Sequence, residues 1–486
     1  MRIETFAAAI VLSAFAQAAE TDIPRLDGSR IPGAQADAAV NRLLAAAEVT
    51  GAAIGILHQG RVVYLHAYGF RDRERKLPLT VDSVLTAASL TKSAFAYLAM
   101  QLVDSHLLDL DKPVEAYLPK PLPEYPGYEG LAGDARYRKL TARMLLDHTS
   151  GFANLRWLEP DRKLKIHFEP GSRYAYSGEG ILLLQLVVET VTHKPLDELM
   201  RERVFQPLGM TRTGMVTAPR FLNDIANGYD EYGRSLGHQN RKEANAAGSM
   251  QTTVRDFTTF LQAMLEGKGI SPAAREQMLS PQIRIHSLHQ FPSLDTATTA
   301  ANDAIRLSYG LGWGLYWSPY GEVFFKEGHD EGFRNYAAAF DGPKDGIVIM
   351  TNSSNGEGIF QELLETLLRD TFTPIEWEGY TPYQKLPRRE PLPVHRRVTV
   401  EAAALDRLVG RYSLSPELVL TVTRRGDHLA MQENNEDAQE MFPESPTRFF
   451  STVSDDVVTF DLDSSGQAVR LTVHTGGRDI PVNRAR

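Results

Sequence analysis

Ser89-Leu90-Thr91-Lys92 opens a helical pattern that continues to about Leu108. A serine is a poor nucleophile at neutral pH unless a base lies beside it. Lys92 follows Ser89 by one helical turn, on the same face, so its amine can reach the serine hydroxyl. The free N–H groups at a helix N-terminus can stabilise a developing oxyanion. Taken alone, however, these four residues favour a helix-capping serine followed by a surface lysine.

Two more short motifs stand just before predicted elements. Tyr176-Ser177 precedes a helical stretch at Gly180–Met200, and Lys326-Glu327-Gly328 precedes a strand at Tyr336–Phe340. A further helical pattern lies at Asp256–Leu265. A serine motif, a tyrosine motif and a lysine motif therefore follow one another along the chain.

Strands open and close this region. Two apolar runs, Gly51–Leu57 and Arg61–Ala67, flank a short glycine-containing turn and predict a β-hairpin. A second pair is expected at Tyr336–Phe340 and Gly346–Thr351. Helical patterns lie outside these strands, at Ala36–Ala47 and Gly358–Asp370. The distribution predicts an α+β fold, an antiparallel sheet made from both chain ends with flanking and inserted helices.

The character of the sequence changes after residue 380. Residues 381–399 are rich in proline and arginine, which predicts a linker. Residues 400–486 contain short β runs separated by glycine-containing turns, which predict a small all-β sandwich or barrel. The expected organisation is one large domain at 19–380, that linker, and a C-terminal β domain.

Together the three motifs resemble a known family. The class C beta-lactamase, penicillin-binding protein and family VIII esterase group has three boxes in this order: serine-x-x-lysine, tyrosine-x-asparagine and lysine-threonine-glycine. Their counterparts here are Ser89–Lys92, Tyr176–Gly178 and Lys326–Gly328. Leu145-Leu-Asp-His-Thr-Ser-Gly151 resembles another signature of the group. The C-terminal part, with Gly410-Arg-Tyr412, resembles the lipocalin-like β module appended to many such hydrolases.

The resemblance implies a beta-lactamase/transpeptidase-like fold and a serine hydrolase that forms an acyl-enzyme with an ester, an amide or D-amino-acid peptide, or a beta-lactam. Ser89 would be the acylated nucleophile, with Lys92 keeping its proton relay aligned. Tyr176 would be the general base, its phenolate favoured by the ammonium groups of Lys92 and Lys326. If it were not, Lys92 would be the base as a neutral amine. The N–H groups of Ser89 and His329 would form the oxyanion hole. The substrate-binding residues would be Lys326, Gly328 and His329.

The sequence departs from the family pattern at two positions. The asparagine of the second box is Gly178, and the threonine of the third box is Glu327. A carboxylate that points into the cleft would repel an anionic substrate, so both changes favour a neutral ester or an unusual peptide over a penicillin. Glu179 could replace the missing polar group, although a solvent-facing or helix N-terminal glutamate is the simpler interpretation.

Other functional interpretations are weaker. Asp147-His148 invites a Ser–His–Asp triad, but the chain has no glycine-x-serine-x-glycine elbow. No His-Glu-x-x-His pattern or comparable cluster indicates a metal site, and we expect neither a metal nor a cofactor. The alternative from another class is a non-catalytic penicillin-binding or sensor protein that keeps the fold.

Composition limits the partners. The chain has 486 residues, no cysteine and a formal net charge of -9. A net negative chain without a basic stripe argues against nucleic acid, and the absence of cysteine excludes disulfides and thiolate chemistry. The expected partner is a small-molecule or peptide acyl substrate. The sequence does not indicate an oligomeric state.

The first residues predict export. Arg2 precedes an apolar run, Phe6–Phe15, which ends in Ala16-Gln17-Ala18. This is the order of a secretory signal, here expected at residues 1–18. The run is too short for a permanent membrane span, so we expect a periplasmic or extracellular mature protein.

Overall fold

The computed structural model describes residues 22–386, 394–415, 418–434, 438–452, 454, 456–475 and 478–485. The expected signal at 1–18 lies outside these residues, as does the 387–393 part of the expected linker.

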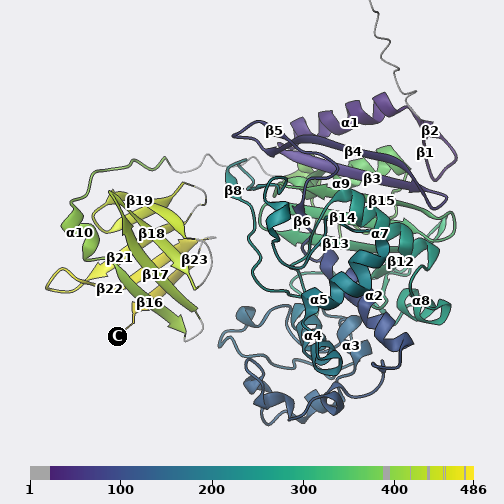
Figure 1. The fold of residues 1–486 in the computed structure, drawn as a ribbon, viewed down its shortest axis with the longest axis horizontal. Helices are drawn as coiled ribbons and strands as arrows, with labels where there is room; N and C mark the ends of the chain where they lie inside the picture. The colour runs from purple at the N-terminus through teal and green to yellow at the C-terminus, as the bar shows by residue number, and fades with distance from the viewer. Residues whose placement is uncertain are drawn as a thin grey trace, which may run out of the picture.

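A nine-stranded antiparallel sheet forms the centre of the large domain, in the order β10-β11-β12-β13-β14-β15-β3-β4-β5 (Figure 1). Strand β15 pairs with β3, so that Ile349 lies opposite Ile54. This pairing joins the two ends of the domain and confirms the expected sheet. The strands are β3 (Gly51–His58), β4 (Arg61–Asp72), β5 (Leu77–Pro78), β10 (Ile283–Arg284), β11 (Ser308–Tyr309), β12 (Gly314–Ser318), β13 (Gly321–Asp330), β14 (Phe333–Phe340) and β15 (Asp345–Thr351).

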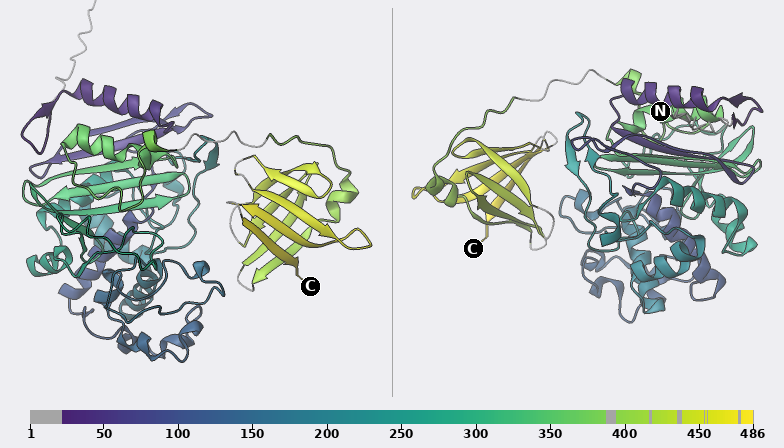
Figure 2. Two further views of the ribbon diagram at one scale, coloured as in Figure 1. Left: turned by 180° about the vertical axis from the view of Figure 1, so that it is seen from behind. Right: turned by 45° about the horizontal axis from the view of Figure 1, so that its top comes forward.

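Two helices cover one face of this sheet. They are α1 (Gly33–Ala46) and α9 (Phe360–Leu368), which lie side by side in Figures 1 and 2. In α1 the buried residues Ala36, Val40, Leu43 and Leu44 recur at helical spacing, and this apolar stripe packs onto the sheet. The expected helices at both ends of the domain are thereby confirmed.

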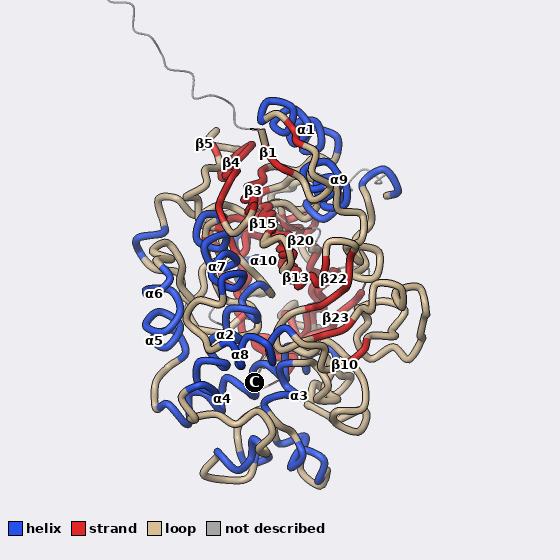
Figure 3. The backbone as a smooth tube through the Cα atoms, turned by 90° about the vertical axis from the view of Figure 1, so that its right-hand side faces the viewer, coloured by secondary structure: helices blue, strands red, loops and turns tan. Residues whose placement is uncertain are grey.

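The inserted helices lie against the other face (Figure 3). Helices α2 (Leu90–Asp104) and α7 (Val254–Glu266) pack directly on the strands. The other inserted helices are α3 (Ala142–Leu146), α4 (Gly178–Thr192), α5 (Leu196–Met200), α6 (Gln206–Leu208) and α8 (Pro272–Leu279).

One predicted helix is divided in the structure. The stretch Gly180–Met200 forms α4 and α5 instead of one helix. His193 adopts a left-handed conformation, with φ 53°, at the C-terminal cap of α4. Pro195 then precedes α5, and because proline lacks an N–H it cannot continue a helix. The apolar spacing on both sides of the break had concealed it.

The C-terminal domain is a closed eight-stranded barrel, which decides between the two expected all-β forms. Strand β16 pairs with both β17 and β23. Apolar side chains that include Leu420, Val422 and Phe449 fill the core. The strands are β16 (Gly410–Ser415), β17 (Leu418–Arg425), β18 (His428–Glu433), β19 (Gln439–Ser445), β20 (Arg448–Ser451), β21 (Val457–Leu462), β22 (Ala468–Thr475) and β23 (Arg478–Arg484), preceded by α10 (Ala402–Asp406).

Candidate active site

Ser89 stands at the N-terminal cap of α2, where the chain leaves a short pair of strands. Strand β6 (Leu85–Thr86) pairs with β9 (Gln251–Thr252). Ala88 then adopts a φ of +50°, a conformation that residues other than glycine rarely adopt and that often marks a functional site. The Ser89 side chain makes no capping hydrogen bond, so its hydroxyl is available for chemistry. Ser89 therefore occupies the N-cap position, as the capping interpretation has it, but its side chain does not cap the helix.

Lys92 lies directly beside the Ser89 hydroxyl. Its Nζ is 3.0 Å from Ser89 Oγ and donates to the Ala247 carbonyl at 2.6 Å. The side chain is buried, so the surface-lysine interpretation is also wrong. Burial, and then the nearby charge of Lys326, lower the pKa of Lys92 to about 7. A large share of this amine is therefore neutral near pH 7, and a neutral amine can accept a proton.

Tyr176 brings the second motif to the same place. Its hydroxyl lies 3.2 Å from Lys326 Nζ, and its ring lies under both amines, 5.1 Å from Lys92 Nζ and 4.8 Å from Lys326 Nζ. Burial raises the pKa of Tyr176 well above 10, and the carboxylate of Glu327 raises it further. This direction opposes the expected phenolate, because burial penalises the charged form and a neighbouring carboxylate repels it.

His148 supports this tyrosine and does not form a triad. The His148 ring lies 4.4 Å from the Tyr176 ring, and His148 Nδ1 accepts a hydrogen bond of 3.2 Å from the backbone N–H of Ser177. Asp147 binds Thr149, with its carboxylate 2.7 Å from the Thr149 hydroxyl. Burial holds the pKa of His148 well below 6.5. His148 is thus a neutral positioning group.

Lys326 reaches the site from strand β13, but its charge is already matched. Its Nζ lies 2.5 Å from Glu327 Oε1, and both side chains are buried. Gln290 Nε2 donates to the same Glu327 oxygen at 3.1 Å. Burial lowers the pKa of Lys326. The Glu327 side chain lines the cleft, so this carboxylate points inward.

Strand β13 presents an open edge to the site. Its pairing with β12 ends where Phe325 meets Gly314, whereas its pairing with β14 continues to Asp330. The N–H of Asp341 donates to the C=O of Glu322, so the backbone N–H and C=O of Glu322 face β14. Along an antiparallel pair, residues whose backbone groups face the partner strand alternate with residues whose groups face away. His329 is an odd number of residues from Glu322, so its N–H points away from β14 to the open edge. This direction suits an oxyanion donor.

Gly328 lets this strand approach the nucleophile. A Cβ at Gly328 would lie 2.5 Å from the Ala87 carbonyl oxygen, which is closer than atoms pack. Any larger residue would push β13 away from the segment that leads into Ser89. Gly328 therefore sets the spacing of the cleft.

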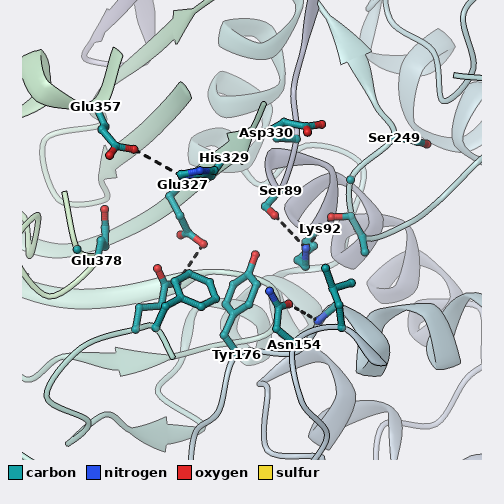
Figure 4. A pocket seen from close by; sticks show the side chains of 18 of the residues that line it. Ser89, Lys92, Asn154, Tyr176, Ser249, Glu327, His329, Asp330, Glu357 and Glu378 are labelled. Carbon is teal, nitrogen blue, oxygen red and sulfur yellow. Dashed lines mark hydrogen bonds and ion pairs between the residues drawn. The ribbon is translucent and has the colours of Figure 1, made fainter. Parts of the chain in front are cut away.

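These groups line one cleft of about 1350 Å³. Figure 4 shows Ser89 joined to Lys92, with the Tyr176 hydroxyl directed between Ser89 and Glu327. Among the expected site residues, Ser89, Lys92, Tyr176 and His329 line this cleft, whereas Lys326 and Gly328 do not. Sequence motifs did not identify Asn154, Gln290 or Glu378, which also line it. Within the described residues no cluster of metal-binding side chains was found.

Comparison with known proteins places this geometry in a family. The model of the family described as Beta-lactamase matches residues 36–368, and a domain of unknown function (DUF3471) matches residues 395–484. The chain belongs to the beta-lactamase family. It is a serine hydrolase of the kind that acts on esters, amides and peptides, or beta-lactams.

Relatives within the beta-lactamase family differ in the activity that their names state. The chain is 24% identical over 440 residues to a penicillin-binding protein of Bacillus subtilis, covering 83% of this chain and 88% of the relative. A D-aminopeptidase of Brucella anthropi is 31% identical over 185 residues, covering 37% of this chain and 35% of the relative. Esterase EstB of Burkholderia gladioli is 30% identical over 211 residues, covering 38% and 52%.

Solved structures of the beta-lactamase type share the fold. The octameric penicillin-binding protein homologue from Pyrococcus abyssi aligns with a TM-score of 0.56 at 20% identity, covering 93% of this chain and 99% of that one. This likeness confirms the beta-lactamase/transpeptidase-like fold. No helix in the described part of the chain has the length and apolarity to cross a membrane.

Proposed function

We propose that this hydrolase forms its acyl-enzyme at Ser89, with Lys92 as the general base and Tyr176 as a hydrogen-bonding relay. The observation that carries the proposal is the 3.0 Å approach of Lys92 Nζ to Ser89 Oγ. The lowered pKa of Lys92, about 7, and the raised pKa of Tyr176 both favour the lysine over the tyrosine as proton acceptor. A general base works best when its pKa lies near the working pH.

The steps follow from this assignment. Neutral Lys92 takes the hydroxyl proton as Ser89 Oγ attacks the substrate carbonyl carbon. The oxyanion that forms is held by the backbone N–H groups of Ser89 and His329. As the carbonyl re-forms, the bond to the leaving group breaks, and the leaving group takes the proton from Lys92 through the Tyr176 hydroxyl. Water then hydrolyses the acyl-enzyme by the same route, with Lys92 again the base.

The cleft favours a neutral ester or amide over a substrate with a free carboxylate. Such a carboxylate needs a cation, but the amine of Lys326 is occupied by Glu327 at 2.5 Å. The group that the cleft wall presents there is the carboxylate of Glu327. Like charges repel more strongly in a partly buried site than in water. Penicillins and D-peptides with a free C-terminus are therefore the poorer substrates.

The test is covalent labelling followed by turnover. A fluorophosphonate probe should label the wild type and the Ser105→Ala control, whose serine is exposed at the far end of α2. Ser89→Ala should abolish labelling and the hydrolysis of p-nitrophenyl butyrate. Labelling that persists in Ser89→Ala would refute the nucleophile. A chromogenic cephalosporin tested beside the ester ranks the two substrate classes.

The proposal includes export to the periplasm or the outside of the cell. Its support is the order of Arg2, the apolar run Phe6–Phe15 and Ala16-Gln17-Ala18. Cell fractionation and N-terminal sequencing test it: the exported protein should begin at Ala19, and deletion of residues 1–18 should retain it in the cytoplasm. A full-length cytoplasmic product would contradict export.

A further inference from the structure

Glu378 lines the cleft and lies on the same side of Tyr176 as Glu327 (Figure 4). The residue is only 3% exposed. Its Oε1 accepts a hydrogen bond of 3.0 Å from the Tyr336 hydroxyl. Its Oε2 has no hydrogen-bond partner, and no basic side chain forms an ion pair with Glu378 among the described residues. Buried carboxyl groups are normally matched by a cation or by hydrogen bonds, so Glu378 lacks a partner that a bound molecule can supply.

A second acceptor without a donor stands next to it. The backbone N–H of Gln290 donates to the Trp377 carbonyl at 2.9 Å, which places Gln290 beside Glu378. Gln290 also lines the cleft and is 2% exposed. Its Nε2 donates to Glu327, but within the described part of the chain its Oε1 has no partner. This stretch of wall therefore combines two carboxyl groups with an unpaired amide oxygen, and it lacks donors.

The amine of Lys326 does not fill this need. Its Nζ lies 2.5 Å from Glu327 Oε1 and 3.2 Å from the Tyr176 hydroxyl, so its charge is matched by Glu327. Glu378 is left as a second carboxyl group without a second cation. A primary ammonium group carries one positive charge and three N–H donors, which is the complement of this wall.

The protonation of Glu378 can follow the ligand. Burial, and then the charge of Glu327, raise the pKa of Glu378 well above 4.5, so the carboxyl group keeps its proton while no cation is near. An ammonium group beside it favours the carboxylate, because an opposite charge stabilises the charged form. The proton then leaves to solvent, and a buried charge exists only when it is matched.

The place of this wall indicates which part of a substrate meets it. In the proposed reaction the leaving group takes its proton at the Tyr176 hydroxyl, next to Lys326 and Glu327. The rest of the leaving group then extends along Glu327 toward Glu378. Phe291, which follows Gln290 in the chain, lines the cleft with an exposed ring 5.3 Å from the Tyr176 ring. This ring offers apolar surface to a chain of methylene groups.

We propose that Glu378, with Glu327 and Gln290, forms a subsite for a primary ammonium group in the leaving group of the substrate. The favoured substrates are therefore esters and amides whose leaving group carries an amine at the end of an apolar chain. An organic ammonium fits better than a metal ion, because no group of three metal-binding side chains was found within the described residues. This inference rests on the proposed function and names its substrate class.

Aminoalkyl butyrates, compared with alkyl butyrates of the same chain length, test the subsite, because a remote amine barely changes the reactivity of the ester bond. In the wild type, kcat/KM should be about tenfold higher for the best aminoalkyl ester than for its alkyl counterpart, as expected of one charge-assisted contact. In Glu378→Gln the two esters should become equal. Glutamine keeps an oxygen for the Tyr336 hydroxyl and has nearly the shape of the protonated acid. The exposed Glu365→Gln on α9 should keep the wild-type ratio.

Binding without chemistry gives a second measurement. In calorimetric titrations the wild type should bind hexylammonium about tenfold more tightly than hexanol, and a folding defect in Glu378→Gln would not affect this comparison. Equal kcat/KM for the paired esters in the wild type, or a preference for the amine that survives in Glu378→Gln, would overturn the inference. Hydrolysis of both esters that persists in Ser89→Ala would instead remove the proposed function, and the titrations would still decide the subsite.

Discussion

Lys326 Nζ lies 2.5 Å from Glu327 Oε1, although the two residues are neighbours on strand β13. Successive side chains of a strand start on opposite faces, so at least one of these two side chains must bend toward the other to form this pair. Both groups are buried, and a buried charge is retained only when it is matched. The third motif therefore holds a neutralised lysine beside Tyr176, and Glu327 is the member of the pair that lines the cleft.

Removal of the Glu327 charge should change substrate preference. In Glu327→Gln the Lys326 amine loses its carboxylate partner and becomes able to attract an anion. We expect the ratio of kcat/KM for a chromogenic cephalosporin to that for p-nitrophenyl butyrate to rise about tenfold or more, in line with one unshielded ion pair in a partly buried site. The conservative Glu327→Asp should leave the ratio low. A ratio that does not rise in Glu327→Gln would show that Lys326 is not accessible to substrate.

The pH dependence of acylation should report Lys92. Its pKa is lowered to about 7, and only the neutral amine accepts a proton, so the rate should rise with pH through about 7 and level off above it. In Lys92→Arg this rise of the acylation rate with pH should disappear, together with nearly all activity, because a guanidinium does not lose its proton in proteins. The exposed Lys268→Arg serves as the control. Stopped-flow kinetics from pH 5 to 9 measure the acylation rate as a function of pH. An unchanged pH dependence in Lys92→Arg would exclude Lys92 as the base.

Tyr176 and Lys92 should differ in importance. General-base catalysis is worth about a hundred- to ten-thousand-fold, so Lys92→Ala should lose that much acylation rate. Tyr176→Phe removes one hydrogen-bonding hydroxyl and should cost about tenfold. The double variant should be little worse than Lys92→Ala, because the two act on one proton. The reverse ranking in single-turnover kinetics would make Tyr176 the base.

Glu179 should matter for stability more than for chemistry. Its carboxylate is buried and forms paired hydrogen bonds with Arg156, at 3.0 Å to Nε and 2.6 Å to Nη2. Glu179→Gln leaves the Arg156 charge without its partner and should lower the free energy of unfolding by about 3 kcal/mol. Urea titration followed by tryptophan fluorescence measures this. Glu202→Gln removes an exposed partner of Lys194 and should not move the midpoint.

Motif order was enough to predict which residues meet. Ser89 and Lys92 lie at the start of α2, Tyr176 lies just before α4 and Lys326 lies within β13, so a correct fold brings the three boxes together. The hairpin at Gly51–Leu57 was predictable for a similar reason, because its turn and its apolar runs are local in sequence.

Protonation and burial were not predictable in the same way. The pKa of Tyr176 depends on burial and on Glu327, which is 151 positions away along the chain. Glu179 is a helix N-terminal glutamate, as expected, yet it is buried because Arg156 comes to it from a preceding loop. Asn154 belongs to no box, yet it lines the cleft, and a Cβ at Gly178 would lie 3.1 Å from its carbonyl oxygen. Barrel closure between β16 and β23 is likewise a long-range contact.

The edge strands of the central sheet affect how copies of this chain behave at high concentration. The outermost strands, β5 and β10, contain two residues each, and β5 includes Pro78. A long unpaired strand is a template onto which another chain can add, whereas very short strands and proline remove that template. The barrel avoids the problem differently, because its first and last strands pair with each other. The closed barrel should therefore resist strand-by-strand aggregation, whereas in the central sheet β5 covers only Phe70–Asp72 of β4 and leaves the outer edge of residues 61–69 without a partner strand among the described residues.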